Sequence, residues 1–147
     1  MNSSLGIIFK NSVIQYFTKI GITPPKDLLR SNQEAFQFLE YHSLVPFSGS
    51  KEGFCLVTAN IPCLEKIGKA LLQENTLDPE MYTHIISEFT NGIAANAGAS
   101  LHEDYDILPP KSNEIKNYEE YNQSIYDIQA IDFQSDTEHC RVYVGMK

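Results

Sequence analysis

The stretch SEFTNGIAANAG, Ser87–Gly98, decides how the centre of this chain folds, because two of its features predict different structures. Its Asn-Gly pair is typical of a tight turn between two strands. The apolar residues around the pair recur instead every three or four positions, as they do along one side of a helix: Met81, Ile85, Ile86, Phe89 and Ile93. We therefore predict a helix that tolerates Asn91 and Gly92 in its interior.

The predicted helix runs from about Pro79 to Leu101. Asp78 can accept hydrogen bonds from the exposed first amides, and proline suits a first helical position, where no amide bond is needed. At 100° per residue two faces separate. The face that we expect to lie on a sheet carries Ile85, Ile86, Phe89, Ile93 and Ala97. The opposite face carries His84, Glu88, Asn91, Ala95 and Gly98.

Glu88 and Asn91 are the chemically interesting pair on the outer face. Residues three apart on a helix are neighbours, so both side chains can act on one target. The residues beside them are small, which leaves a bare surface that another backbone can approach. Gly92 costs roughly 1 kcal/mol relative to alanine inside a helix, and a docking face is one reason to tolerate that cost. Helix–helix packing is the alternative reason, and periodicity does not separate the two.

The rest of the chain predicts helices and hairpins. A first helix follows the apolar stripe from Leu5 to Ile20 and ends at Gly21. The segment ITPPKDLLRSN, 22–32, is predicted to be a loop. Two strands joined by SGSKEG, 48–53, form a hairpin, and Pro62 opens a second helix that ends near Gln73.

The last third of the chain is predicted to be a loop followed by a second hairpin. The loop is ILPPKSNEIKNYEEYNQ, 107–123, and the strands are SIYDIQAIDF and HCRVYVGM, with turn chemistry in QSDTE between them. Strands segregated into hairpins favour an α+β fold, with an antiparallel sheet and three main helices packed on it. The length of 147 residues suits a single domain, 1–147.

Composition excludes several classes of protein. The net charge of −8 argues against a nucleic-acid binder, which needs clustered lysine and arginine. The cysteines Cys55, Cys63 and Cys140 lack CxxC spacing, and we expect reduced, buried thiols rather than disulfides or a metal site. The four histidines also lack metal-ligand spacing. With no basic leader and no long apolar run, we expect a cytoplasmic protein without a membrane span.

These residues resemble the CheC/CheX group of bacterial chemotaxis phosphatases, and the CheX branch most closely. EFTNGIAANA is similar to the family's E-x-x-N helix, with Glu88, Asn91, Asn96 and Ala97 in the matching places. VPFSGSKEGFCLVTA is similar to its strand-Gly-strand hairpin. The first helix has Ile8 where a second E-x-x-N motif needs a glutamate before Asn11. A single E-x-x-N site indicates a CheX-like rather than a CheC-like member.

The resemblance implies hydrolysis of the aspartyl phosphate of a CheY-type response regulator. Asn91 would orient the attacking water, and Glu88 would pair with a lysine of the regulator. His84, Gly92, Ala95 and Gly98 would form the surrounding contact surface. The resemblance implies no cofactor of the chain's own, with Mg²⁺ held by the regulator, and a homodimer. Asn96 projects nearer the apolar face, and we expect a buried amide bonded to backbone.

Two alternatives remain at this point. A domain of the same fold could bind regulators or serve as a scaffold without catalysis, and a small-molecule-binding α+β domain is a weaker third possibility. The strand HCRVYVGM bears on the expected homodimer, because Val142–Met146 carries no charged residue. An open sheet edge there would favour pairing with a second copy, and burial of the strand within the same chain is the alternative.

Overall fold

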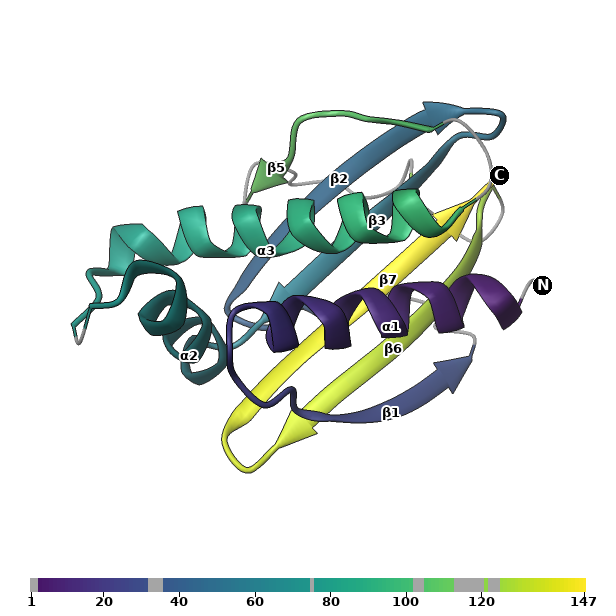
Figure 1. Cartoon of the computed structure of the whole chain (residues 1–147). Coiled ribbons are helices and arrows are strands. Elements are labelled where there is room, and N and C mark those ends of the chain that lie inside the picture. The colour runs from purple at the N-terminus through teal and green to yellow at the C-terminus, as the bar shows by residue number, and fades with distance from the viewer. Residues whose placement is uncertain (1–2, 32–35, 75, 102–104, 113–120, 122–124) are drawn as a thin grey trace.

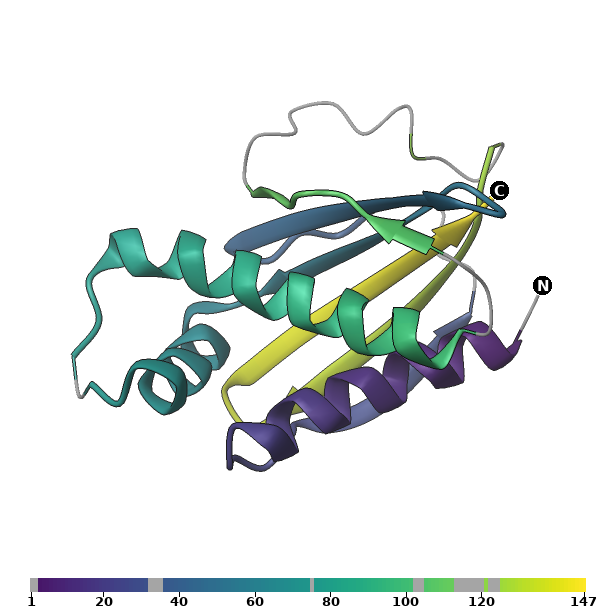
Figure 2. The same cartoon turned by 45° about the horizontal axis from the view of Figure 1, so that its top comes forward.

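The computed structural model describes residues 3–31, 36–74, 76–101, 105–112, 121 and 125–147. Three helices cover one face of an antiparallel sheet (Figures 1 and 2), as the sequence predicts. The two long helices lie side by side on that face and run in opposite directions. The fold class is therefore α+β, as expected from the segregated hairpins.

The helices are α1 (Ser3–Lys19), α2 (Ile61–Leu72) and α3 (Pro79–Ser100). Each lies within a residue or two of its predicted bounds. Gly21, at φ 81°, follows α1, and Gln73 adopts the left-handed conformation directly after α2. The predicted cap of α3 is wrong in one respect: Asp78 occupies the N-cap position, but its carboxylate makes no capping hydrogen bond. Proline at the first helical position still marks the start of α3.

The strands are β1 (Lys26–Ser31), β2 (Tyr41–Gly49), β3 (Gly53–Ala59), β4 (Tyr105–Ile107), β5 (Lys111–Ser112), β6 (Asp127–Ser135) and β7 (Glu138–Met146). Their order across the sheet is β1-β6-β7-β3-β2-β4, and β5 also pairs with β2. Both predicted hairpins are confirmed, β2 with β3 and β6 with β7. All these pairings are antiparallel.

Two segments predicted as loops contain strands. Lys26–Ser31 pairs with β6 despite the preceding prolines, with Lys26 opposite Gln134. The partner strand lies more than a hundred residues away in the sequence, so the local sequence does not mark this strand. The segment 107–123 overlaps the end of β4 and contains β5, both of which pair with β2. Residues 113–120 and 122–124 of the predicted loop lie outside the described part of the chain.

The strand predicted to offer an open edge lies inside the sheet. β7 pairs with β6 on one side and with β3 on the other, from Gly53 opposite Met146 to Ala59 opposite Cys140. Its uncharged run needs no gatekeeper because both of its edges are hydrogen-bonded. The alternative, burial of this strand within the chain, is therefore confirmed, and the edge argument for pairing with a second copy is wrong.

Side chains alternate between the two faces of the sheet, so β2, β3, β6 and β7 each contribute to two apolar clusters. The larger cluster lies beneath the helices and includes Phe9, Phe17, Val57, Phe89 and Val142. The smaller cluster lies on the opposite face and contains Leu44, Phe54, Leu56, Tyr121, Ile128, Ala130 and Tyr143. The helices are thus fixed by an almost fully buried layer, which sets the position of α3.

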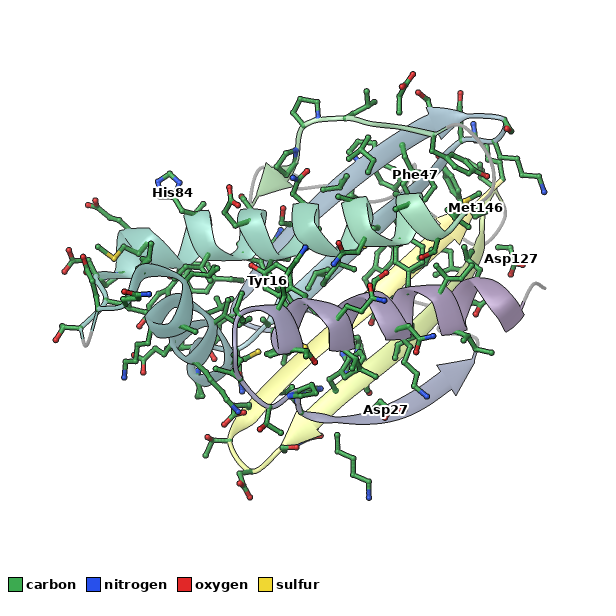
Figure 3. All side chains as sticks on the ribbon, viewed as in Figure 1. Tyr16, Asp27, Phe47, His84, Asp127 and Met146 are labelled. Carbon is green, nitrogen blue, oxygen red and sulfur yellow. The ribbon has the colours of Figure 1, made fainter. Side chains whose placement is uncertain are left out.

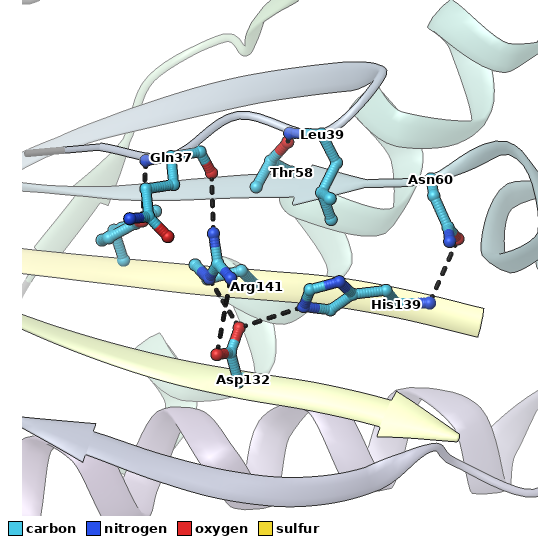
Figure 4. A network of polar contacts seen from close by, with 8 residues as sticks. Gln37, Leu39, Thr58, Asn60, Asp132, His139 and Arg141 are labelled. Carbon is cyan, nitrogen blue, oxygen red and sulfur yellow. Dashed lines mark hydrogen bonds and ion pairs between the residues drawn. The ribbon is translucent and has the colours of Figure 1, made fainter. Parts of the chain in front are cut away.

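A polar network crosses the same opposite face (Figure 4). Arg141 of β7 donates to the Asp132 carboxylate, directly across the strand pair, and to the main-chain oxygen of Gln37 at 2.9 Å. His139 lies 3.2 Å from the same carboxylate. The Arg141 and Asp132 side chains are 7% and 2% exposed. This buried ion pair ties the central strands to the segment that precedes β2.

Candidate functional site

The outer face of α3 carries the predicted pair of functional side chains. Glu88 and Asn91 are both exposed and lie one turn apart on the same helix. His84 and Ala95 are also exposed, and Figure 3 shows His84 projecting from the side of α3 away from α1. The carboxylate, the carboxamide and the imidazole therefore point into solvent without a covering segment among the described residues.

The opposite face of α3 explains why the pair is held outward. The residues predicted to face the sheet are all buried: Ile85, Ile86, Phe89, Ile93 and Ala97. They pack into the cluster beneath the helices, which fixes the rotation of α3 about its axis. The prediction of the buried face is thus confirmed, and the outward direction of Glu88 and Asn91 follows from it.

The two glycines of the predicted contact surface are each contacted within the chain. A Cβ on Gly98 would lie 3.5 Å from Cδ1 of Ile107 on β4, so Gly98 faces the sheet edge more than the outer surface. A Cβ on Gly92 would lie 2.5 Å from Cε1 of Tyr16 on α1. The helix-packing alternative therefore accounts for Gly92, and both glycines are only partly exposed.

Tyr16 of α1 lies against the turn of α3 that carries the pair, and the sequence reasoning did not identify this contact. Its ring lies between α1 and α3 (Figure 3), 5.0 Å from the Phe89 ring centroid to centroid. Partial burial, and next the negative charge of Glu88, raise the pKa of the Tyr16 phenol to about 12. The apolar periodicity of the first helix includes Tyr16 and so indicates that it packs against the rest of the chain. It does not indicate the contact with Gly92, because that contact depends on how the two helices pair.

A groove of about 470 Å³ lies beside this contact. Its lining residues are Ile14, Gln15, Thr18 and Lys19 of α1 and Asn96 of α3. Asn96 is half-buried rather than fully buried, and it faces α1 across the groove. The predicted backbone bond of its amide stays a prediction.

The cysteines and histidines do not form a metal centre in the described part of the chain, where no three His, Cys, Asp or Glu side chains are grouped to hold an ion. Cys55, Cys63 and Cys140 are free and buried, as expected. Burial raises the pKa of the Cys55 thiol, and a hydrogen bond with Cys63, followed by burial, raises that of Cys140. These thiols are poor nucleophiles and belong to the core.

None of the helices in the described residues combines the length and apolarity that crossing a bilayer requires.

Comparison with known proteins identifies the family. The family model of the chemotaxis phosphatase CheX matches residues 41–134, which is more than half of the chain and includes the whole of α3. A comparison with curated proteins finds no significant match.

Solved structures share the fold over nearly the full length. A chemotaxis protein CheX from Desulfovibrio desulfuricans is 20% identical, with a TM-score of 0.78 and coverage of 98% of this chain and 99% of that one. A CheC-like superfamily protein from Shewanella sp. PV-4 is 18% identical, with a TM-score of 0.78 and coverage of 100% and 99%.

A third similar structure is the Borrelia burgdorferi complex of CheX with CheY, BeF₃ and Mg²⁺. It is 18% identical, with a TM-score of 0.73, and the match covers 95% of this chain and 96% of that one. At these identities the structures establish the fold, and the family model establishes the membership. The chain belongs to the CheX family of chemotaxis phosphatases.

Proposed function

We propose that the protein hydrolyses the aspartyl phosphate of a CheY-type response regulator. The observation that carries the proposal is the exposed Glu88 and Asn91 pair, one turn apart on a helix whose rotation is fixed by its buried face. Membership of the CheX family, and the Borrelia relative seen with CheY, support this choice of substrate. The proposed assembly is a homodimer, on the family resemblance alone.

Hydrolysis of an acyl phosphate needs little covalent chemistry from the enzyme. A water must lie in line with the bond between phosphorus and the aspartate oxygen, and the developing charge must be stabilised. The water oxygen bonds to phosphorus, the phosphorus–aspartate bond breaks, and the aspartate leaves as a carboxylate. Free phosphate carries away the oxygen of water.

Asn91 is the proposed catalytic residue. Its carboxamide oxygen can accept a hydrogen bond from the water, and its amide nitrogen can donate to the phosphoryl group. Glu88 is the proposed partner-binding carboxylate, which pairs with a lysine beside the phosphorylated aspartate and so places Asn91 over the phosphorus. The Mg²⁺ of the reaction is proposed to be held by the regulator.

The decisive experiment replaces the amide while keeping the surface. Asn91→Ala is expected to lower the phosphatase rate constant on the order of a hundredfold, because the water loses its orienting group. Binding to the regulator activated with beryllofluoride is expected to survive. The measurement is the rate of phosphate loss from a radiolabelled phosphorylated regulator, with and without the protein.

Asn11→Ala is the matched control, since Asn11 is an exposed asparagine on α1 with Ile8, not a glutamate, three residues before it. It is expected to keep the full rate. A wild-type protein that binds regulators without accelerating phosphate loss would instead be a scaffold of the same fold. A wild-type protein that binds none of the regulators of its source organism would contradict the proposal altogether.

A further inference from the structure

The sheet is built from two halves that are related by an approximate two-fold axis between β3 and β7. Its order, β1-β6-β7-β3-β2-β4, reads the same from the opposite end when β1 is exchanged with β4, β2 with β6 and β3 with β7. In the chain, each half begins with a long helix, continues with an edge strand and ends with a hairpin. α2 joins the halves, and β5 has no equivalent among the described residues. α1 therefore holds in the first half the place that α3 holds in the second (Figure 1).

The strand registers show which residues of the two halves are equivalent. β2 and β6 each have nine residues, and the seventh is phenylalanine in both, Phe47 and Phe133. Phe47 lies opposite Ile107 of β4. Phe133 lies opposite Asp27 of β1. The two edge-strand positions, Asp27 and Ile107, are thus equivalent and lie 80 residues apart in the sequence.

The same separation of 80 residues aligns α1 with α3. It pairs four buried apolar residues of α1 with four of α3, all in the cluster beneath the helices: Leu5 with Ile85, Phe9 with Phe89, Val13 with Ile93 and Phe17 with Ala97. On the outer faces it pairs the exposed Asn11 with the exposed Asn91. The sheet register and the burial of the helices therefore agree on one alignment, in which Asn11 is the equivalent of the proposed catalytic amide.

The surroundings of the two amides differ. Glu88 is exposed on α3, whereas its equivalent on α1, Ile8, is partly buried and packs against the cluster beneath the helices. Two exposed alanines of α3 have longer exposed equivalents on α1: Gln15 for Ala95 and Lys19 for Ala99. α1 thus keeps the amide and lacks both the carboxylate and the short side chains around it.

We infer that α1 carries a second copy of the proposed α3 site, which keeps its amide and is closed to a regulator by Ile8, Gln15 and Lys19. The inference rests on the proposed function, and it accounts for a single working site on two equivalent helices. A regulator lysine that docks on α1 meets the apolar Ile8, and so loses its water without gaining a partner. Lys19 repels the same lysine, and the side chains of Gln15 and Lys19 cover helix backbone that alanines leave open.

The experiment opens the α1 copy after the α3 site has been disabled. Glu88→Ala with Asn91→Ala removes the docking carboxylate and the amide, and this disabled protein is expected to bind beryllofluoride-activated regulator poorly and not to accelerate phosphate loss. Adding Ile8→Glu, Gln15→Ala and Lys19→Ala gives the rebuilt protein. It is expected to bind the regulator again and to raise the rate of phosphate loss about tenfold over the disabled protein. Urea titration checks that every variant is folded.

Ile7→Glu in place of Ile8→Glu is the matched control. Ile7 is 53% exposed, so the same charge is added one position away from the equivalent of Glu88, and no restored binding is expected. Asn11→Ala, added to the rebuilt protein, is expected to remove the accelerated phosphate loss and to keep regulator binding. Ile8→Gln is the second variant if a charge at this partly buried position prevents folding. It supplies an uncharged acceptor and is expected to restore binding more weakly.

Three outcomes would overturn the inference. The rebuilt protein folds and neither binds nor dephosphorylates the regulator, its accelerated phosphate loss survives Asn11→Ala, or Ile7→Glu restores binding equally well. In each case the wild-type protein remains an active phosphatase, so only the α1 copy fails. A wild-type protein that neither hydrolyses nor binds any phosphorylated regulator removes the proposed function and this inference together.

Discussion

At the scale of single residues, Gly92 is subject to two opposing effects, its low helix propensity and the close approach of the Tyr16 ring. Glycine disfavours a helix interior by roughly 1 kcal/mol relative to alanine, yet here the absence of a side chain lets the Tyr16 ring approach the backbone. The ring is fixed by Phe17 and Phe89 and has little freedom to move aside. The close approach, rather than helix propensity, therefore decides which residue is tolerated.

We therefore predict that Gly92→Ala changes the free energy of unfolding in opposite directions with and without the Tyr16 ring. In the wild-type background Gly92→Ala is expected to lower the free energy of unfolding by about 1 to 2 kcal/mol, because the new methyl group overlaps Tyr16. In a Tyr16→Ala background the same change is expected to raise it by about 1 kcal/mol, since only helix propensity remains. Urea denaturation of the four proteins measures both values. The same sign in both backgrounds would show that Tyr16 does not restrict the position.

At the scale of elements, α2 depends on one asparagine that also joins it to the sheet. The Asn60 Oδ1 accepts from the amide of Cys63, at the first turn of α2, and from the amide of His139 at the start of β7, each at 3.1 Å. The Asn60 Nδ2 donates to the Thr137 oxygen at 2.7 Å. One side chain thus starts the helix and holds the turn between β6 and β7.

Asn60→Ala is expected to lower the free energy of unfolding by about 2 kcal/mol, the upper end for loss of an N-cap, because two amides lose their acceptor. Asn60→Asp keeps the acceptor for both amides and loses only the bond to Thr137, so it is expected to cost less. Thermal and urea unfolding measure the two differences. Equal losses would place the stabilisation in the Thr137 contact instead.

The elements that the sequence predicts are those whose signals are local. The helices have a regular apolar period and an end marked by proline or glycine, and the two hairpins have turn residues between β-rich runs. β1, β4 and β5 have no such signal, because they are short and exist through pairing with β6 or β2. The same limit applies to the site: periodicity alone directs Glu88 and Asn91 outward, whereas the contact of Tyr16 with Gly92 depends on which helix lies beside α3.

At the scale of the whole molecule, the two faces of the sheet carry different features. The helices and the proposed site occupy one face, and the buried Arg141–Asp132 pair stabilises the other. Breaking a buried pair leaves an uncompensated charge, and here the main-chain oxygen of Gln37 also loses its donor. We therefore expect a change in this pair to alter stability without altering the proposed site.

Arg141→Met is expected to lower the free energy of unfolding by about 3 kcal/mol while the folded protein keeps its phosphatase rate. Lys147→Met is the control, since it breaks an exposed pair with Glu52 at 2.7 Å and is expected to change stability little. Chemical denaturation and the phosphate-release assay provide the two readouts. A fall in the rate of folded Arg141→Met would show that the far face of the sheet acts on the site.

The central position of β7 also governs when the molecule can be assembled during synthesis. β1 awaits β6, and the second edge of β3 awaits β7, so the sheet is joined only after the ribosome has released residues 127–146. Until then only part of the sheet is present beneath the helices. The unpaired edge of β3 can then pair with strands of other proteins. The sheet is therefore completed only when the β6–β7 hairpin joins β1 to β3.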